Sequence, residues 1–225
     1  MARVDPLEQP GIRGFLHQPE GADEGGLVLT HGAGGDCRSP LLVAVADAFC
    51  HRGIAVLRCD LPFRQRRAKG PPSPAHAPAD REGLRLAVAA LRAIVSGPVF
   101  LGGQSYGGRQ ASLLAADLPE LAAGLLLFSY PLHPPGKPQR LRSEHFPRLR
   151  VPVVFVQGAA DPFASIAELE AALALIPAAT RLIPIPGAGH DLKRGRFDLD
   201  AVAEEFLKHN GPDPSPGGAI RSRLC

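Results

Sequence analysis

The sequence predicts an α/β fold in which a mostly parallel sheet carries helices on both faces, and two observations support this prediction. First, short apolar runs of strand length recur along the 225 residues, most of them bounded by Gly, Pro or polar residues. Second, segments with a helical pattern lie between these runs. Strands that alternate with helices are joined by right-handed crossovers, so the strands run parallel and helices cover both faces of the sheet.

The apolar runs and the segments between them give the expected elements in order. Six runs are expected to form buried strands, at residues 27–31, 54–58, 99–102, 124–128, 153–157 and 181–185, with an additional strand at the sheet edge near residues 12–17. Helices are expected at residues 40–52, 79–96, 108–117, 164–176 and 199–210. These elements predict one domain over residues 11–210, followed by a Pro- and Gly-rich tail, 211–225, that we expect to be disordered.

Two long segments interrupt this alternation. Residues 60–78 (DLPFRQRRAKGPPSPAHAP) are rich in proline, and residues 130–150 (YPLHPPGKPQRLRSEHFPRLR) form a still longer connection. Connections of this length inside a compact domain are usually functional or mobile. We therefore expect both segments to border a binding site.

Charge and composition argue against several classes of protein. The chain is 45% hydrophobic and 21% charged, which is ordinary for a globular protein, and its net charge of +3 is too small to indicate nucleic-acid binding. A local cluster of cations, Arg64, Arg66, Arg67 and Lys69, has no aromatic ladder beside it and is best interpreted as a solvated loop. No uninterrupted apolar run of about 18 residues is present, so no membrane-spanning helix is expected.

The cysteines and the N-terminus indicate a cytoplasmic protein. Cys37, Cys50, Cys59 and Cys225 show neither a Cys-x-x-Cys pair nor clustering with histidines, so we expect reduced thiols and no metal site. The first residues (MARVDPLEQPGIRG) lack the apolar core of a secretory signal. No motif for an organic cofactor was found either.

The stretch GGQSYGGR, residues 102–109, places four glycines around Ser105 between an expected strand and an expected helix. Glycine is unfavourable in regular elements, so this density indicates a backbone that bends tightly. A Gly-x-Ser-x-Gly turn of this kind can present a serine hydroxyl above the end of a strand as a nucleophile. The motif alone is weak evidence, since a glycine-rich turn can contain a serine by chance.

The ends of the other strands supply the partners that a nucleophilic serine needs. In a parallel α/β sheet, ligands bind outside the carboxyl ends of the strands. Ser105, Asp161 and His190 each follow an expected strand, in the chain order nucleophile, acid, base. His190 would take the proton from Ser105, and Asp161 would orient the imidazole and stabilise its charged form.

Other residues compete for these roles. Asp60 and Asp191 are alternative acids, and Asp161 could instead cap the helix that follows it. His133 and His145 lie in the segment 130–150, where a histidine could contact a substrate. We prefer Asp161 because Asp60 follows a strand on the far side of the expected sheet order and Asp191 adjoins the base itself.

A serine nucleophile also needs two preorganised donors for the developing oxyanion. The backbone N–H of Tyr106, at the start of the following helix, is the first candidate, since the helix dipole there favours negative charge. The second is Ala33, in the glycine-rich loop HGAGG that follows the first buried strand. Gly32 beside it lets the backbone approach a substrate closely.

On these residues the chain resembles the α/β-hydrolase superfamily over nearly all of residues 11–210. More narrowly, LTHGAGG, GGQSYGGR, LFSYPLHPPGKPQRLR, QGAADPF and LPFRQRRAKGPP resemble a small dienelactone-hydrolase-like group. That group includes the testis-expressed protein and the third regulatory subunit of the NSL histone-acetyltransferase complex. The resemblance implies a hydrolase fold without a large cap domain. True dienelactone hydrolases use a cysteine where this chain has Ser105, so their substrate is not carried over.

The sequence is compatible with two other functions. A dinucleotide-binding oxidoreductase fits Gly32-Ala33-Gly34 after a strand, but the third glycine of that fingerprint would fall at Cys37. A hydrolase fold used only for binding or as a scaffold is the stronger alternative, because fold does not imply function. The complete set of nucleophile, acid, base and oxyanion loop favours catalysis.

The sequence therefore predicts a serine hydrolase that cleaves an ester, thioester or related acyl bond of a small molecule through an acyl-enzyme. It needs no metal or organic cofactor and binds neither nucleic acid nor membrane. Gly32, His133, Arg66 and Arg67 are the candidate substrate-binding residues. If the cations of residues 64–69 and 130–150 border the site, they would favour an acidic group, but a solvated loop is the preferred interpretation. The natural substrate and the oligomeric state do not follow from the sequence.

Overall fold

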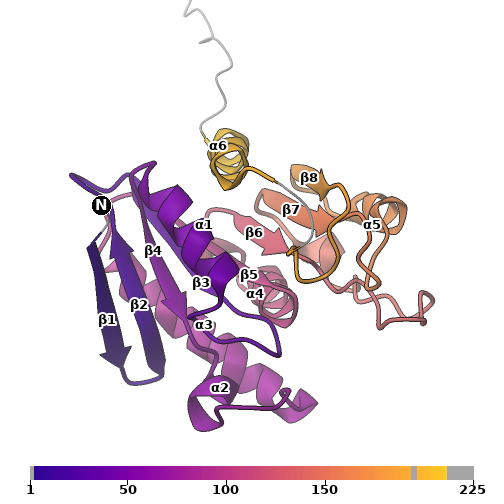
Figure 1. Cartoon of the computed structure of the whole chain (residues 1–225), viewed down its shortest axis with the longest axis horizontal. Helices are drawn as coiled ribbons and strands as arrows, with labels where there is room; N and C mark the ends of the chain where they lie inside the picture. Colours follow the sequence, from indigo (N-terminus) through magenta and orange to yellow (C-terminus); the bar gives the residue numbers. More distant parts are fainter. Residues whose placement is uncertain (1–2, 194–196, 212–225) are drawn as a thin grey trace, which may run out of the picture.

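An eight-stranded sheet forms the centre of the computed structural model, which describes residues 3–193 and 197–211 (Figure 1). The strands lie in the order β1-β2-β4-β3-β5-β6-β7-β8. They span Arg3–Gln9 (β1), Ile12–Gln18 (β2), Gly25–Thr30 (β3), Ile54–Cys59 (β4), Val99–Gln104 (β5), Leu125–Phe128 (β6), Val153–Gly158 (β7) and Thr180–Ile185 (β8). The strands from β4 to β8 pair in parallel, whereas β1 and β2 are antiparallel. The predicted α/β fold with a mostly parallel sheet is confirmed.

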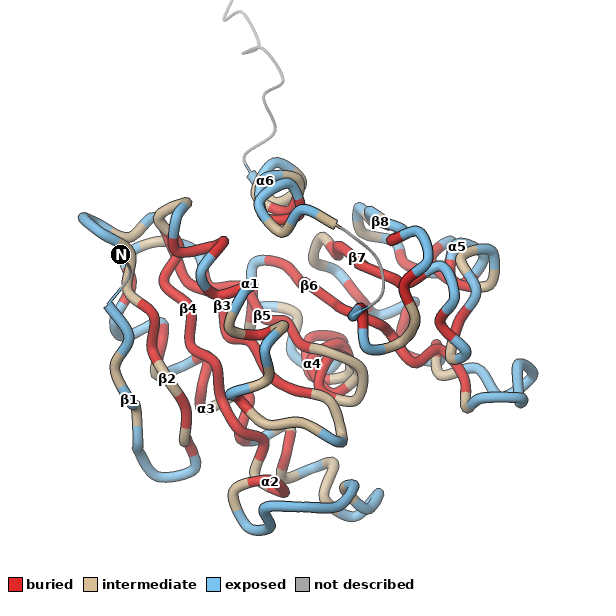
Figure 2. The backbone as a smooth tube through the Cα atoms, in the orientation of Figure 1, coloured by how far each residue is buried: buried red, intermediate tan, exposed pale blue. Residues whose placement is uncertain are grey.

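Helices cover both faces of the sheet, as the alternation of elements predicts. One face carries α1 (Pro40–Cys50) and α6 (Leu199–Asn210), and the other carries α3 (Ala77–Arg92), α4 (Tyr106–Asp117) and α5 (Ile166–Leu173). Alternate residues of one strand serve the two layers: Leu27 and Leu29 pack toward α1, and Val28 packs toward α3. Figure 2 shows the buried strands between more exposed helices and loops. Burial on both sides explains why the inner strands are continuously apolar. Strand β8 was also expected to be buried, but it lies at the sheet edge and most of its residues are partly or fully exposed.

Three further elements differ from the expectation. The expected edge strand, β2, is the second strand of the sheet, because β1 pairs outside it. No strand was expected at β1, since Pro6 and exposed polar residues interrupt its apolar pattern. Within the segment 60–78, the short helix α2 (Pro62–Arg66) was also missed, because five residues are too few to show a helical period.

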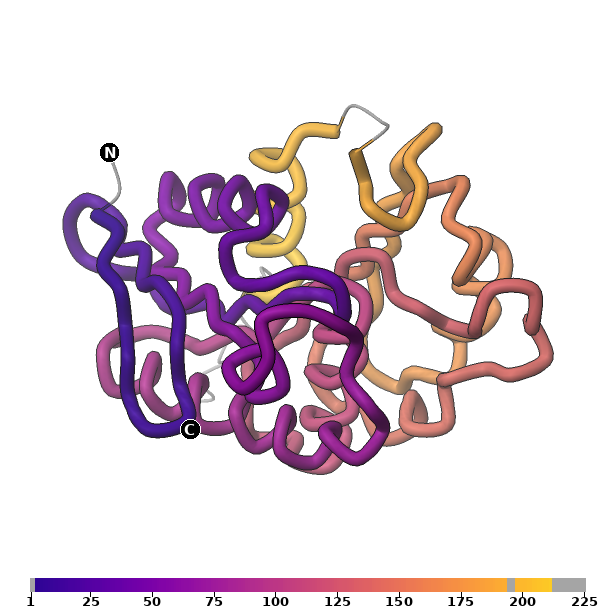
Figure 3. The backbone as a smooth tube through the Cα atoms, turned by 60° about the horizontal axis from the view of Figure 1, so that its bottom comes forward, coloured from indigo at the N-terminus to yellow at the C-terminus, as the bar shows by residue number. Residues whose placement is uncertain are grey.

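The long segments meet the carboxyl ends of the strands. In Figure 3 the segment after β4 lies beside the loop after β3 at the centre of this end of the sheet, and hydrogen bonds join the two. The segment 130–150 contains one short 3-10 helix, η3 (Phe146–Arg148), and four of its apolar side chains are fully buried: Tyr130, Leu132, Phe146 and Leu149. These anchors fix the segment on the core, and the described residues contain no separate cap domain.

The expected disordered tail lies outside the described residues, apart from Gly211. Among the helices in the described ranges, none combines the length and the apolar character that crossing a bilayer requires.

Candidate active site

Ser105 lies at the sharp turn from β5 into α4, with a φ of 50° and a ψ of −116°. Left-handed φ values are uncommon for residues other than glycine and mark a constrained backbone. The glycines around the serine allow close packing of the turn. A Cβ at Gly107 would lie 2.4 Å from the carbonyl oxygen of His31, and one at Gly103 would lie 2.9 Å from the backbone of Gly107. The crowding of glycine in GGQSYGGR therefore serves the tight strand-to-helix turn.

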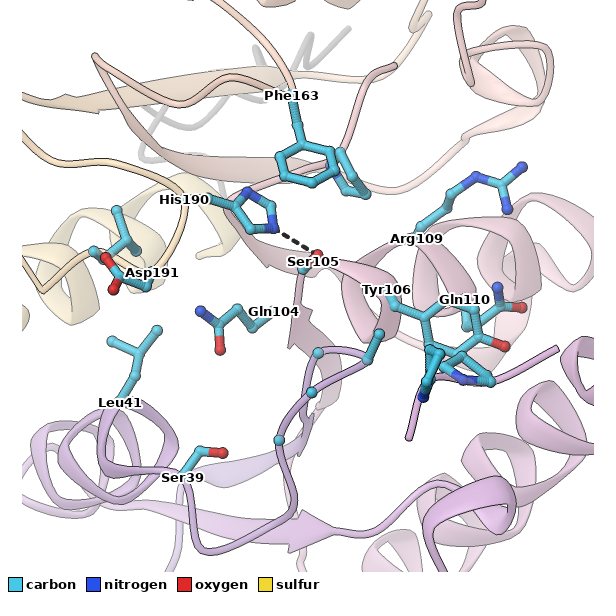
Figure 4. A pocket seen from close by; sticks show the side chains of 18 of the residues that line it. Ser39, Leu41, Gln104, Ser105, Tyr106, Arg109, Gln110, Phe163, His190 and Asp191 are labelled. Atoms are coloured by element: carbon cyan, nitrogen blue, oxygen red, sulfur yellow. Dashed lines mark hydrogen bonds between the residues drawn. The ribbon is translucent and has the colours of Figure 1, made fainter. Parts of the chain in front are cut away.

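The turn places Ser105 against His190 (Figure 4), whose imidazole also contacts Asp161. The Nε2 atom of His190 lies 2.8 Å from Ser105 Oγ, and its Nδ1 atom lies 2.8 Å from Asp161 Oδ2. An ionised carboxylate only accepts hydrogen bonds, so Nδ1 carries the ring proton and Nε2 accepts the hydroxyl proton of the serine. The structure thus brings together the three residues that the sequence predicted as nucleophile, acid and base.

The surroundings of Asp161 hold its carboxylate in place. Its side chain is fully buried, and it accepts hydrogen bonds from Gln157 Nε2 at 2.8 Å and from the backbone N–H of Phe163 at 2.9 Å. The Phe163 ring also packs against the imidazole of His190, with the ring centroids 4.1 Å apart. Donors that satisfy the carboxylate keep it oriented toward the histidine.

The competing acids are engaged elsewhere. Both oxygens of Asp60 are used, one by the backbone N–H of Cys37 at 2.7 Å and the other by Arg13 at 2.8 Å. Burial alone would raise the pKa of Asp60, but these hydrogen bonds outweigh it and lower the pKa. Asp191 is exposed and faces Lys193, not the histidine ring. Asp161 is therefore the carboxylate that orients His190.

Two backbone N–H groups lie beside the serine. Ala33 comes from the loop after β3, and Tyr106 is the residue that follows Ser105. Neither the N–H of Ala33 nor that of Tyr106 donates to another group of the described residues. Tyr106 begins α4, where the first N–H groups have no partner within the helix. Both groups are thus available to an oxyanion formed on a substrate.

His31 orients the peptide that carries the Ala33 N–H. The backbone N–H of Leu61 donates to Nε2 of His31 at 3.1 Å, so Nδ1 holds the proton and donates to the Gly32 carbonyl at 2.8 Å. Burial lowers the pKa of His31, in agreement with a neutral ring. A carbonyl that accepts a hydrogen bond polarises its own peptide, which strengthens the Ala33 N–H as a donor.

Arg64 holds the next part of the same loop. Its guanidinium donates to the carbonyls of Ala33 at 2.8 Å and Gly35 at 2.9 Å, although only 5% of the residue is exposed. Sequence reasoning assigned Arg64 to a solvated cluster, which is wrong for this residue. Nothing in the spacing distinguishes it from Arg66, which is exposed.

A cavity of about 1020 Å³ opens over the serine. Gly32, Ala33, Tyr106 and His190 line it, as do apolar side chains that include Leu41 and Phe163. Most of its wall is therefore apolar with a few polar groups, which is typical of sites for small molecules.

Three of the expected substrate-binding residues do not line this cavity. His133 is buried and faces Glu168, Arg66 is exposed, and Arg67 donates to the carbonyls of Lys69 and Pro71. Among the described residues, the cations that line the cavity are Arg109, Arg142 and Lys193, none of which was singled out from the sequence. Arg142 lies in the segment 130–150, which was expected to border the site with its cations, and Arg109 lies one helical turn after Ser105.

No other nucleophile stands out in the described residues. Cys37, Cys50 and Cys59 are buried, and burial raises the pKa of their thiols to between about 11 and about 12. Reactive cysteines need a lowered pKa and access to solvent. The described residues also contain no group of three or more His, Cys, Asp or Glu side chains placed to hold a metal ion.

Comparisons with known proteins agree with this architecture. A family model described as alpha/beta hydrolase domain matches residues 23–209. Similar solved structures include a dienelactone hydrolase from Anabaena variabilis (24% identity, 93% of this chain and 96% of that chain covered, TM-score 0.70). TT1662 from Thermus thermophilus has 24% identity, covers 93% and 98%, and gives a TM-score of 0.72.

A third similar structure is XC6422 from Xanthomonas campestris, described as an α/β serine hydrolase without a lid. It has 20% identity, covers 92% of this chain and 94% of that chain, and gives a TM-score of 0.71. At these identities the solved structures show a shared fold, and the family model extends over most of the chain. The chain belongs to the α/β-hydrolase family.

Proposed function

We propose that this protein is a serine hydrolase that cleaves an ester or thioester bond of a small molecule. The observation that supports this most strongly is the continuous line of hydrogen bonds from Ser105 through His190 to Asp161 at the wall of a cavity. A serine hydroxyl becomes nucleophilic when a base accepts its proton. The loop that carries the unpaired Ala33 N–H supplies a hydrogen-bond donor for the oxyanion that forms next.

The first half of the reaction forms an acyl-enzyme. Ser105 Oγ attacks the carbonyl carbon of the substrate while its proton moves to Nε2 of His190. The N–H groups of Ala33 and Tyr106 stabilise the negative charge on the carbonyl oxygen. When the tetrahedral intermediate collapses, the bond to the leaving group breaks, and His190 returns the proton to the departing oxygen or sulfur.

The second half releases the acid. A water molecule loses a proton to His190 Nε2 and attacks the acyl carbon, and the same N–H donors stabilise the second tetrahedral intermediate. Its collapse breaks the bond to Ser105 Oγ, which regains a proton from His190. Asp161 keeps the imidazole oriented and stabilises its positive charge in both halves.

Within the α/β-hydrolase family, we place the chain with the dienelactone-hydrolase-like group that includes the testis-expressed protein and the NSL-complex subunit. The motifs LTHGAGG and GGQSYGGR support this placement. A binding or scaffold role is the alternative. A scaffold role does not explain why Ser105 is hydrogen-bonded to His190 and through it to Asp161.

Labelling with a fluorophosphonate probe tests the proposal, because the probe reacts with activated serines. Wild type should be labelled, and Ser105→Ala and His190→Ala should not. Ser112→Ala is the matched control: Ser112 is also hydrogen-bonded to a histidine, His145, but it is fully buried, so its loss should leave labelling intact. Absence of labelling in folded wild-type protein would contradict the proposal and favour the scaffold role.

A further inference from the structure

The cavity over Ser105 carries an unbalanced positive charge. Among the described residues that line it, the cations are Arg109, Arg142 and Lys193, and the only acid is Asp191. Asp191 faces Lys193, with Oδ2 of the acid 3.7 Å from Nζ of the lysine. Neither arginine forms an ion pair with a carboxylate of the described residues. The two guanidinium groups therefore lack a counter-charge of their own.

Arg109 belongs to the same turn of helix as the nucleophile. Its backbone N–H donates to the carbonyl of Ser105 at 2.9 Å, so its side chain begins on the face of α4 that carries the serine. In Figure 4, Arg109 lies on the opposite side of Ser105 from Leu41 and Asp191. Its Nε atom is buried and has no hydrogen-bond partner among the described residues. Burial of an unpaired donor is unfavourable, so this group is suited to an incoming acceptor.

Arg142 comes from the long segment after β6, and its backbone is fixed to the core. Its N–H donates to the carbonyl of Leu132 at 2.7 Å, and its carbonyl accepts the hydroxyl of Tyr130 at 2.9 Å. The only side-chain hydrogen bond of Arg142 to the described residues goes to the Pro131 carbonyl, at a long 3.3 Å. Arg109 and Arg142 line the same cavity. Burial lowers the pKa of Arg142, and the positive charge of Arg109 lowers it further.

Gln110 adds another unused donor to the lining of the same cavity. The residue lines the cavity and is fully buried. Its Oε1 atom accepts a hydrogen bond from Arg81 Nη1 at 3.2 Å, which fixes the orientation of the amide. The Nε2 atom is left buried without a partner among the described residues. Two like charges and a buried free amide in the lining of one cavity favour an anion with several acceptor oxygens.

We propose that Arg109, Arg142 and Gln110 form a subsite for a carboxylate group of the substrate. The inference rests on the proposed function, because the carboxylate belongs to the molecule whose acyl bond Ser105 attacks. A carboxylate accepts several charge-assisted hydrogen bonds at once and neutralises the repulsion between the arginines. The substrate class is thus a small ester or thioester that carries a free carboxylate, such as a monoester of a dicarboxylic acid.

Matched pairs of chromogenic esters test this subsite. Mono-p-nitrophenyl succinate is compared with its neutral methyl ester, which places the carboxylate on the acyl side. On the leaving-group side, 4-acetoxybenzoate is compared with methyl 4-acetoxybenzoate. We expect wild type to favour the carboxylated member of at least one pair by about tenfold or more in kcat/KM. No preference in either pair would overturn the proposal.

Variants assign the preference to residues. In R109Q/R142Q the ratio of kcat/KM within the preferred pair should fall close to one, whereas R66Q, which removes an exposed cation away from the cavity, should retain the wild-type ratio. Thermal unfolding of each variant checks that it is folded. A preference that survives in the folded double variant, or that disappears equally in R66Q, would contradict the subsite.

A binding measurement separates this inference from the proposed function. Calorimetric titration of Ser105→Ala with mono-p-nitrophenyl succinate needs no turnover. Binding that is at least about tenfold tighter than for the neutral methyl ester, and that is lost when R109Q/R142Q is added, supports the subsite even if wild type hydrolyses no ester. Equal affinity for the two compounds would overturn the subsite while leaving the labelling result for Ser105 untouched.

Discussion

Two serine–histidine pairs involve the same helix, with Ser105 at the start of α4 and Ser112 within it, and only one pair has the arrangement of a nucleophile. Ser105 and His190 are 2.8 Å apart, and so are Ser112 and His145. In the first pair, Asp161 accepts from Nδ1 of the histidine, so the serine donates its proton to Nε2. In the second, the Ser112 hydroxyl donates to the Arg109 carbonyl at 2.9 Å, so the histidine must be the donor and cannot act as a base.

The backbone and solvent around the two serines differ as well. Ser105 lies at a strained turn beside the cavity and next to the N–H of Tyr106. Ser112 is inside α4, fully buried, and Nδ1 of His145 has no partner among the described residues. A short serine–histidine distance is therefore not sufficient evidence for a nucleophile. The direction of proton donation, fixed by a third group, distinguishes the two pairs.

The largest expected effect comes from removing the carboxylate that sets this direction. In Asp161→Asn, the amide can donate to Nδ1 of His190, so Nε2 would carry the proton and the pair would come to resemble Ser112 and His145. We expect kcat for an activated ester to fall by about 10⁴-fold with little change in KM. Steady-state kinetics on p-nitrophenyl acetate measure this.

Asp191→Asn is the control for that substitution, since Asp191 adjoins the histidine but faces Lys193. Its effect on kcat should be far smaller. If the two variants lost activity equally, the account of proton direction in the first pair would fail.

A smaller effect is expected from loosening the loop that supplies an oxyanion donor to Ser105 and not to Ser112. Arg64→Met removes the donors to the carbonyls of Ala33 and Gly35. We expect kcat to fall by about 10- to 100-fold, less than for direct loss of a donor. The free energy of unfolding should also fall by about 2 kcal/mol, because buried carbonyls lose their partners.

Kinetics and urea unfolding of Arg64→Met, each compared with Arg66→Met, measure these two changes. Arg66 is exposed, so its substitution should be neutral in both assays. A fall in stability with kcat unchanged would show that Arg64 is only structural and does not position the loop for catalysis.

The smallest effect on activity concerns the second pair, where the change appears in stability alone. Burial, followed by the charges of Arg109 and Arg148, lowers the pKa of His145 from 6.5 to about 4. The unfolded chain therefore binds a proton at higher pH than the native state does, and stability decreases as the pH falls from about 6.5 toward 4. The expected loss is about 3 kcal/mol in the free energy of unfolding.

Urea unfolding of wild type and His145→Gln across this range measures the contribution of that one histidine. The glutamine amide can still donate to Ser112 but does not titrate. The variant should lose less stability on acidification than wild type does. Parallel curves for the two proteins would show that His145 does not titrate as its burial implies.

Much of the fold could be predicted because its signals are strong and local. The inner parallel strands are short apolar runs such as VVFVQ, since both of their faces are buried. Strand β1 and helix α2 could not be found in this way. The first is exposed and contains Pro6, and the second has only five residues and is held by tertiary contacts such as those of Arg64.

The site was predicted to different depths. Chain order and position after strands were enough to select Ser105, Asp161 and His190, which the structure brings within hydrogen-bonding distance, while their catalytic roles stay predictions. The arginines that line the cavity could not be selected in the same way. Which arginine of a basic stretch is buried depends on how the stretch folds back on the sheet, and local sequence does not encode this. Arg66 was therefore expected at the cavity, whereas Arg142 lines it.

The most direct test of the central claim is to locate a fluorophosphonate adduct on the wild-type protein by peptide mass spectrometry. Trypsin cleaves after Arg109 and so separates residues 93–109, with Ser105, from residues 110–140, with Ser112. We predict a single adduct on the first peptide, assigned to Ser105 by its fragment ions. An adduct on Ser112, or none on either peptide from folded protein, would contradict the account.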